Sequence, residues 1–329
     1  MTSSETVGRY LKRGVERLLS PVMRLHTFVS TSRLPRQQEK ISELRRGDCW
    51  CLIVLDACRY DVFAEVHDEY LRGSLEPVRS AGYNTFDYVR LNWPDTYEDV
   101  TYVTAAAPIT AKQFDFESGD ERADGLLMVG DELAEKYRGY VPNDHLSDIV
   151  EVWRDSWDEV LGVCPPEPVT ERVVDLAPEK VVAHYFQPHA PYIGSEKSLS
   201  SMDPYDVDVT GGAVDAEVWQ RVRDGTIDDS ELRTLYTENL RRALQSVCEL
   251  VSRTDYDRYV VVGDHGEALG EYGRYAHPPL EHPYIRKVPW FEVEGVREDH
   301  PVVEYERGDA TPESRSVEER LQQLGYLDG

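Results

Sequence analysis

Two apolar runs, each ending in a potential metal ligand, constrain this chain more than any other feature. Residues 52–55 are all apolar and lead into Asp56, and residues 260–262 lead through a glycine into Asp264 and His265. The carboxyl ends of parallel strands meet at one edge of a sheet, where ligand sites commonly form. Carboxylate and imidazole groups are typical ligands of zinc and manganese. The two runs therefore predict an α/β enzyme with a metal at the edge of its sheet.

The remaining pattern supports that fold class, because strand-like and helix-like stretches alternate. It predicts a mainly parallel central sheet with helices on both faces, a three-layer α/β sandwich. Strands are expected at 51–55, 100–104, 180–186, 258–263 and 288–293, and helices at about 61–72, 84–91, 131–138, 147–161 and 230–253.

Three regions are expected along the chain. Residues 1–46 form a basic amphipathic helical segment, and residues 47–310 form the catalytic domain, with a loop-rich insertion at about 194–229. A capping box beginning at Ser316 predicts a C-terminal helix within 311–329.

The charge is extreme for 329 residues, with a formal net value of −26. Arginine also outnumbers lysine, a combination typical of haloarchaeal-type proteins from salt-loving organisms, whose carboxylates hold a hydration layer. A basic partner is the alternative, but the acidic residues form no localised tract. The charge argues against nucleic acid as a partner.

Residues 1–46 depart from this composition, with ten basic and four acidic side chains. Apolar residues recur at helical spacing from Val7 to Val22. One interpretation is a helix that packs on the domain. The other is a peripheral contact of residues 1–25 with an anionic membrane surface.

Five cysteines, at positions 49, 51, 58, 164 and 248, include no CxxC pair and are read as buried free thiols. No apolar run approaches the roughly 18 residues of a membrane span, and no signal peptide is recognised. The prediction is a soluble, cytoplasmic protein, with peripheral attachment to the membrane as the alternative.

Threonine and histidine residues add candidates for the chemistry. Thr85 follows a glycine turn at a predicted helix start, where it is either a helix cap or a nucleophile. Asp56 has a similar alternative as a helix cap. His184 falls within a strand and reads as a core histidine, whereas His189 lies beyond the strand between two prolines. His277 lies close enough to Asp264 in the sequence to fold back over the site.

These segments together resemble a known superfamily. V-L-D-A-C-R-Y-D at 54–61, V-V-G-D-H-G-E-A-L-G-E-Y-G-x-Y-x-H at 261–277 and Val-Pro-Trp at 288–290 are similar to the alkaline phosphatase superfamily. The sulfatase-like branch, with its lipoteichoic acid synthases and phosphoethanolamine transferases, is the most similar. The resemblance covers about residues 50–293.

The resemblance implies roles for individual residues. Asp56, Thr85, Asp264 and His265 would hold one zinc or manganese ion, with Thr85 also the nucleophile. The catalytic group would be Thr85, His189 and His277. The two histidines, and Arg59, are also candidates for substrate contact or for a second metal.

One departure from the sulfatases directs the functional prediction. The chain lacks the C/S-x-P-x-R sequence that is converted to formylglycine, since Asn84-Thr85-Phe86 stands there. We therefore expect a metal-dependent phosphoester hydrolase or phosphotransferase that acts on a phosphodiester or a modified glycan or lipid head group. The alternatives are a sulfate-ester hydrolase of the same fold and a non-catalytic binding or scaffold protein.

Overall fold

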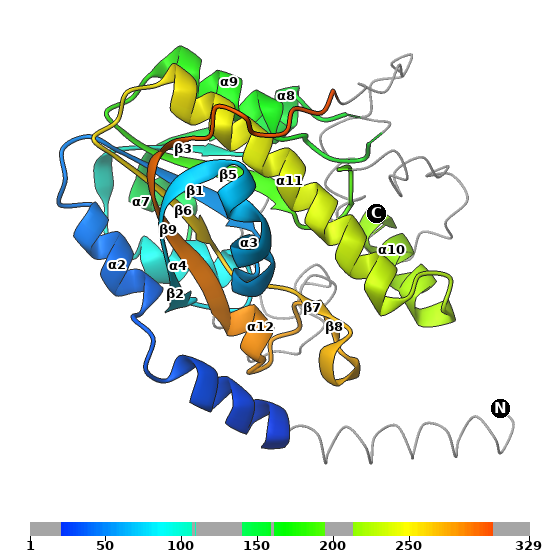
Figure 1. The fold of residues 1–329 in the computed structure, drawn as a ribbon. Helices are drawn as coiled ribbons and strands as arrows, with labels where there is room; N and C mark the ends of the chain where they lie inside the picture. Colours follow the sequence, from blue (N-terminus) through cyan, green and yellow to red (C-terminus); the bar gives the residue numbers. More distant parts are fainter. Residues whose placement is uncertain (1–20, 107–108, 110–139, 159–160, 195–212, 305–329) are drawn as a thin grey trace, which may run out of the picture.

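The structure is a computed structural model that describes residues 21–106, 109, 140–158, 161–194 and 213–304. Its centre is a seven-stranded sheet, accompanied by a small two-stranded one (Figure 1). The large sheet contains β1 (Trp50–Asp56), β2 (Leu71–Arg79), β3 (Tyr97–Thr104), β4 (Leu146–Glu151), β5 (Lys180–Pro188), β6 (Arg258–Gly263) and β9 (Lys287–Val296). The small one pairs β7 (Ala268–Leu269) with β8 (Tyr275–Ala276).

The large sheet is mainly parallel, as predicted. Its strand order is β2-β9-β6-β1-β5-β3-β4, and the five strands from β6 to β4 run parallel. Strand β9 is antiparallel to both of its neighbours, β6 and β2. Strand β1 lies between β6 and β5, so the three strands with the candidate ligands are adjacent at the centre.

Helices cover both faces, which confirms the three-layer class (Figure 1). Alternate residues of β1 enter different cores: Ile53 packs on the side of α3, α9 and α11, and Val54 on the side of α2 and α4. This period of two is what a strand buried on both faces requires. The helices are α2 (Gln37–Leu44), α3 (Tyr60–Val66), η1 (His67–Glu69), α4 (Thr85–Asn92), α7 (Pro142–His145), α8 (Val152–Asp155), α9 (Glu167–Leu176), α10 (Ala213–Asp224), α11 (Asp229–Arg253), η3 (Glu271–Gly273) and α12 (Pro283–Arg286).

All five predicted strands are present, but some predicted helices are wrong. Residues 147–161 were expected to be helical, yet strand β4 occupies 146–151 and α8 is only one turn. The predicted helix at 61–72 ends at Val66, and β2 begins at Leu71. Residues 213–224, placed in a loop-rich insertion, form helix α10. The predicted helices at 131–138 and 311–329 lie outside the described residues.

A helix over residues 21–31, called here the N-terminal helix, packs beside η3 and α12 (Figure 1). His26 Nδ1 lies 2.6 Å from the hydroxyl of Tyr272, and its ring also contacts Tyr284. Residues 1–20, which carry most of the predicted amphipathic pattern, lie outside the described residues. Within the described chain, no helix has the length and apolar character that crossing a membrane requires. Cytoplasmic localisation stays a prediction.

Candidate metal centre

The carboxyl ends of β1 and β6 bring three predicted ligands together. Asp56 is the last residue of β1, and Asp264 and His265 directly follow β6. One ligand atom from each lies within 4.8 Å of the others, and all three residues are buried. Asp264 Oδ1 accepts hydrogen bonds from the backbone N–H groups of Ala57 (2.9 Å) and His265 (2.7 Å). These two bonds fix the carboxylate and leave its Oδ2 facing the centre.

Thr85 joins this group from helix α4. Its Oγ1 lies 3.2 Å from Asp56 Oδ2 and 3.1 Å from Asp264 Oδ2. Thr85 is the first residue of α4, and Asn84 is the helix cap, its side chain accepting from the N–H of Asp87 at 2.9 Å. Because Asn84 performs the capping, the Thr85 hydroxyl is available to the two carboxylates.

The glycine turn before Thr85 has a packing reason. A Cβ atom at Gly82 would lie 1.8 Å from the Cβ of Asp87. Only glycine allows the loop to approach the first turn of α4 this closely. The approach also lets the N–H of Tyr83 donate to Asp87 Oδ2 at 3.4 Å. The loop and the helix start therefore form one unit that positions Thr85.

His265 presents a single nitrogen to the centre. Its Nδ1 is 2.9 Å from the carbonyl oxygen of Gly266, which can only accept, so Nδ1 carries the proton of the neutral ring. Its Nε2 lies 3.3 Å from Asp264 Oδ2 and 3.5 Å from Asp56 Oδ1, with no hydrogen-bond partner among the described residues. A lone pair facing two carboxylates is unfavourable unless a cation lies between them.

His184 belongs to the same centre, which the sequence interpretation missed. It is a buried strand residue as expected, and its Nδ1 lies 2.9 Å from the hydroxyl of Tyr102. Its Nε2, however, lies 3.8 Å from Asp56 Oδ2 and has no hydrogen-bond partner among the described residues. The signal that could have identified it is its position on β5, the strand next to β1. His184 pairs with Val54, two residues before Asp56, where the register of the two strands shifts.

His189 and His277 meet at the open side of the centre. Their Nε2 atoms are 3.1 Å apart, and the centroid of the His277 ring is 4.4 Å from that of His265. His189 Nδ1 lies 2.7 Å from the carbonyl oxygen of Ala190, which fixes its tautomer in the same way as in His265. The His277 ring is hydrogen-bonded to the backbone of Tyr83. The structure thus brings both predicted histidines to the site.

Burial keeps the imidazoles of His184, His265 and His277 neutral. It lowers the pKa of His184 to about 4, and it also lowers the pKa of His265, despite the opposing effect of Asp264. The pKa of His277 is lowered well below its usual value by poor solvation first, and then by repulsion from His265 and His189. Neutral imidazole is the form that coordinates a metal.

Two helices on opposite faces hold the loops of the site. From α11, Asn239 Nδ2 donates to the carbonyl oxygens of Pro188 (3.1 Å) and His189 (3.0 Å). From α2, the buried Gln37 donates from Nε2 to the carbonyl oxygen of Gly263 at 2.6 Å, and its Oε1 accepts from the N–H of Ala81 at 2.9 Å. Gln37 thereby connects the segment before Asp264 to the turn before Thr85.

Arg59 lies in a buried network of ion pairs beside the site, and its predicted contact with substrate or a second metal stays a prediction. Its guanidinium is buried and pairs with Asp61 at 2.8 Å and with Glu271 at 2.7 Å. It also stacks on the ring of Tyr284, with 4.2 Å from Cζ to the centroid. Arg59 therefore links the turn after β1 to the 267–271 loop. Its guanidinium contacts none of the candidate metal ligands among the described residues.

The donor set fits a divalent cation. Two buried carboxylates, a hydroxyl and an imidazole nitrogen converge on one point, with His184 Nε2 nearby. Such oxygen and nitrogen donors suit zinc or manganese, whereas the five cysteines are free and none is among the converging groups. The residues present can therefore hold the predicted ion.

Comparison with known proteins finds only distant similarity. No protein-family profile and no curated protein matches the chain. The soluble domain of lipooligosaccharide phosphoethanolamine transferase A from Neisseria meningitidis matches with 16% identity and a TM-score of 0.41, covering 74% of this chain and 75% of that chain. The periplasmic domain of a phosphoethanolamine transferase from Campylobacter jejuni gives 14% and 0.42, covering 74% and 78%. The phosphonate monoester hydrolase of Agrobacterium radiobacter gives 13% and 0.41, covering 75% and 68%.

Proposed function

We propose that this protein is a metal-dependent phosphoester hydrolase or phosphotransferase with Thr85 as its nucleophile. The observation that carries the proposal is the position of Thr85 Oγ1, which lies 3.1–3.2 Å from two buried carboxylates that also meet His265. Asp56, Asp264, His265 and Thr85 would hold one zinc or manganese ion. When bound, the ion would lower the pKa of the hydroxyl and neutralise charge on the phosphoryl group.

The chain's own residues define the two chemical steps. Thr85 Oγ1 attacks phosphorus while its proton passes to the neutral His189–His277 pair, a new P–O bond forms to Thr85, and the bond to the leaving alcohol breaks. The histidine pair then gives that proton to the departing oxygen. In the second step, water or an acceptor alcohol gives a proton to the same pair as it attacks the phospho-threonine, and the pair returns that proton to Thr85 Oγ1 as the P–O bond to Thr85 breaks. Water gives hydrolysis, and an alcohol gives transfer.

The two outer histidines have a second candidate role. Because His189 Nδ1 faces a carbonyl oxygen, its neutral ring directs the lone pair of Nε2 at His277, 3.1 Å away. A protonated phosphoryl oxygen that hydrogen-bonds to this lone pair, or a second metal ion that binds it, would stabilise the two facing nitrogens. We therefore propose that His189 and His277 bind the substrate, with a second ion as the alternative occupant.

A turnover assay tests the nucleophile. We expect metal-loaded protein to cleave bis-p-nitrophenyl phosphate, and Thr85→Ala to reduce the rate at least about 1,000-fold while metal content is retained. Mass spectrometry of trapped wild-type protein should place a phosphoryl adduct on the Thr85 peptide. Thr234→Ala, on the exposed side of α11, is the matched control. Activity persisting in Thr85→Ala contradicts the covalent mechanism.

The same panel separates the two other functions. Faster cleavage of p-nitrophenyl sulfate than of either aryl phosphate would favour a sulfate-ester hydrolase. Metal analysis addresses a scaffold role, because Asp264→Asn should abolish stoichiometric zinc or manganese. Protein that binds no metal in the wild-type form, and cleaves none of these esters, would contradict the enzymatic proposal.

We also propose that the N-terminal helix touches an anionic membrane surface. Its apolar residues Val22, Leu25, Phe28 and Val29 are each more than half exposed, whereas Met23, Thr27 and Thr31 are buried on the other side. Residues 1–46 carry ten basic and four acidic side chains, which complements anionic lipid. Leu25→Asp should reduce sedimentation with phosphatidylserine vesicles, and Leu176→Asp, at an exposed apolar site on α9, should not.

A further inference from the structure

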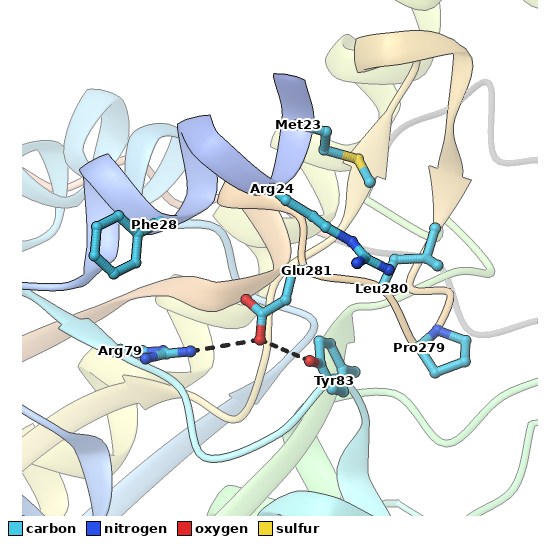
Figure 2. A pocket seen from close by; sticks show the side chains of 8 residues that line it. All are labelled: Met23, Arg24, Phe28, Arg79, Tyr83, Pro279, Leu280 and Glu281. Atoms are coloured by element: carbon cyan, nitrogen blue, oxygen red, sulfur yellow. Dashed lines mark hydrogen bonds and ion pairs between the residues drawn. The ribbon is translucent and has the colours of Figure 1, made fainter. Parts of the chain in front are cut away.

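A cavity of about 370 Å³ lies between the N-terminal helix and the loops that lead to the candidate centre. Its size is within the range of small-molecule sites. Figure 2 shows Arg24 and Met23 extending from the helix toward Leu280, with Glu281 between Arg79 and Tyr83. The lining consists of Met23, Arg24, Phe28, Arg79, Tyr83, Pro279, Leu280 and Glu281.

The cavity adjoins the centre without including it. Tyr83 is two residues before Thr85, and its backbone is hydrogen-bonded to the ring of His277. Residues 279–281 follow His277 closely in the chain. A molecule with one group at Thr85 could therefore extend past His277 into the cavity.

The charge around the cavity is positive in a strongly acidic protein. Glu281 Oε1 accepts from the hydroxyl of Tyr83 at 2.8 Å and from Arg79 at 3.4 Å. Arg286 Nε lies 3.9 Å from Glu281 Oε2, and its guanidinium stacks on Tyr83 at 4.6 Å. Arg24 has no ion-pair partner among the described residues.

Arg79 and Arg286 thus share one carboxylate, that of Glu281, and Arg24 lines the same cavity. Asp87, whose charge also acts on Arg286, pairs with Arg90 at 3.4 Å. In a chain of net charge −26, this local excess of positive charge favours an anion.

Apolar side chains line the rest of the cavity and continue to the surface. Met23, Phe28 and Leu280 line the cavity, and Phe28 is 66% exposed. From Phe28 the exposed apolar side of the N-terminal helix runs on through Leu25 and Val29. An apolar chain attached to the anion would follow this path out of the cavity.

We infer that the cavity is a subsite for an anionic group carried on an apolar chain. The substrate of the Thr85 site would then be an anionic amphiphile with a second acidic group, such as an acidic lipid head group. Arg24 and Arg79 would bind that acidic group, and Met23, Phe28 and Leu280 would contact its chain. This inference rests on the proposed function for the reacting ester, but the subsite itself is testable by binding alone.

The test is calorimetric titration of full-length Asp264→Asn protein, stripped of metal with a chelator, so that the metal centre does not contribute. The probes are hexyl phosphate, inorganic phosphate and hexanol. We expect hexyl phosphate to bind most tightly, and Arg24→Gln and Arg79→Gln each to weaken it about tenfold. Arg33→Gln, an exposed arginine outside the cavity, is the matched charge control.

The apolar wall has its own variant pair. Phe28→Ser should reduce the preference for hexyl phosphate over inorganic phosphate, and Leu176→Ser should leave it unchanged. Equal binding of inorganic phosphate, or equal loss in Arg33→Gln, would overturn the inference. Cleavage of bis-p-nitrophenyl phosphate by wild-type protein is measured separately, so failure of the subsite and failure of the proposed activity are distinguished.

Discussion

At the scale of single residues, the imidazoles of the site share one arrangement. In His265 and His189, Nδ1 lies against a backbone carbonyl oxygen, and in His184 it lies against the hydroxyl of Tyr102. Each Nε2 therefore faces the centre or its open side. In His265 and His189 the carbonyl oxygen can only accept, so it selects the tautomer before any ion or substrate arrives, whereas the Tyr102 hydroxyl orients the His184 ring and can pair with either tautomer.

His184 provides the first prediction. Its Nε2 lies 3.8 Å from Asp56 Oδ2, close enough to orient that carboxylate or to bind the same ion. We expect His184→Gln to weaken metal affinity about 10- to 100-fold, as loss of a supporting ligand partner commonly does. Chelator competition measures the change, and His145→Gln, far from the site, should have no effect. Unchanged metal affinity in His184→Gln would assign His184 to packing alone.

Gly82 provides a second prediction at this scale. An added Cβ would lie 1.8 Å from the Cβ of Asp87, so the turn and the start of α4 would have to separate. Thr85 would move with them, and a displacement of about 1 Å can cost about 100-fold in rate. We expect Gly82→Ala to lower kcat far more than it lowers metal content. Gly47→Ala, whose added Cβ would lie 3.3 Å from the carbonyl oxygen of Leu44, is the milder control.

The site residues differ in how far the sequence could predict them. Asp56, Asp264 and His265 directly end apolar runs, so their place at the sheet edge follows from strand direction. His184 lies inside such a run, on β5. The register of β5 against β1 brings it to Asp56, and no local sequence pattern reveals that register. Arg59 lies within the 54–61 motif, but its partner Glu271 comes from the 261–277 motif, and no local pattern reveals this long-range ion pair.

At the scale of elements, helices hold the loops of the site from both faces of the sheet. Gln37 of α2 bonds to Gly263 and Ala81 on one face, and Asn239 of α11 bonds to the His189 loop on the other. These side chains satisfy backbone groups that would otherwise be buried without partners. The sheet edge supplies the ligands, and the helices fix the loops that carry the nucleophile and the outer histidine.

Replacing Gln37 tests this role of α2. Gln37→Met keeps the size of the side chain but leaves the Gly263 carbonyl and the Ala81 N–H without their partner. We expect the free energy of unfolding to fall by about 2 kcal/mol or more, since each buried unsatisfied group costs about 1–3 kcal/mol. Gln37→Glu retains the acceptor for Ala81 and should recover part of kcat. Denaturant titration and turnover measure the two effects, and an unaltered midpoint in Gln37→Met would contradict the prediction.

The strands of the large sheet that the sequence failed to predict lie at its two edges. Strand β2 is an edge strand with a glycine, a proline and several charges, and such strands are weakly patterned because one side has no neighbour. Strand β4 is the other edge, and its pairing with β3 overrides a local helical pattern. The central strands are buried on both faces, so they consist of continuous apolar runs from which their positions could be predicted.

At the scale of the whole molecule, the features linked to substrate lie on one side. The N-terminal helix contacts Tyr272 and Tyr284, near the loop that carries His277, and it forms a wall of the cavity beside Tyr83 (Figures 1 and 2). Its exposed apolar residues therefore lie beside the route to Thr85. A membrane contact through this helix would present the cavity to lipid.

The net charge leads to a prediction about salt. The chain has 62 acidic and 36 basic side chains, so even complete pairing would leave 26 carboxylates to repel one another. Surface pairs such as Arg253–Glu171 lose strength in salt, but exposed pairs contribute only about 0–1 kcal/mol each. Relief of the repulsion should exceed that loss.

We therefore expect the midpoint of thermal unfolding to rise by several degrees as KCl increases to about 1 M, where the Debye length falls to about 3 Å. NaCl at equal ionic strength should give the same rise, because screening depends on ionic strength and not on the identity of the cation. Scanning calorimetry of the metal-free protein in both salts measures this without a contribution from the metal centre. If the unfolding temperature rises only at salt concentrations well above 1 M, the cause would be salt exclusion from apolar surface. If the unfolding temperature decreases as salt is added up to 1 M, the ion pairs outweigh the repulsion of the excess charge.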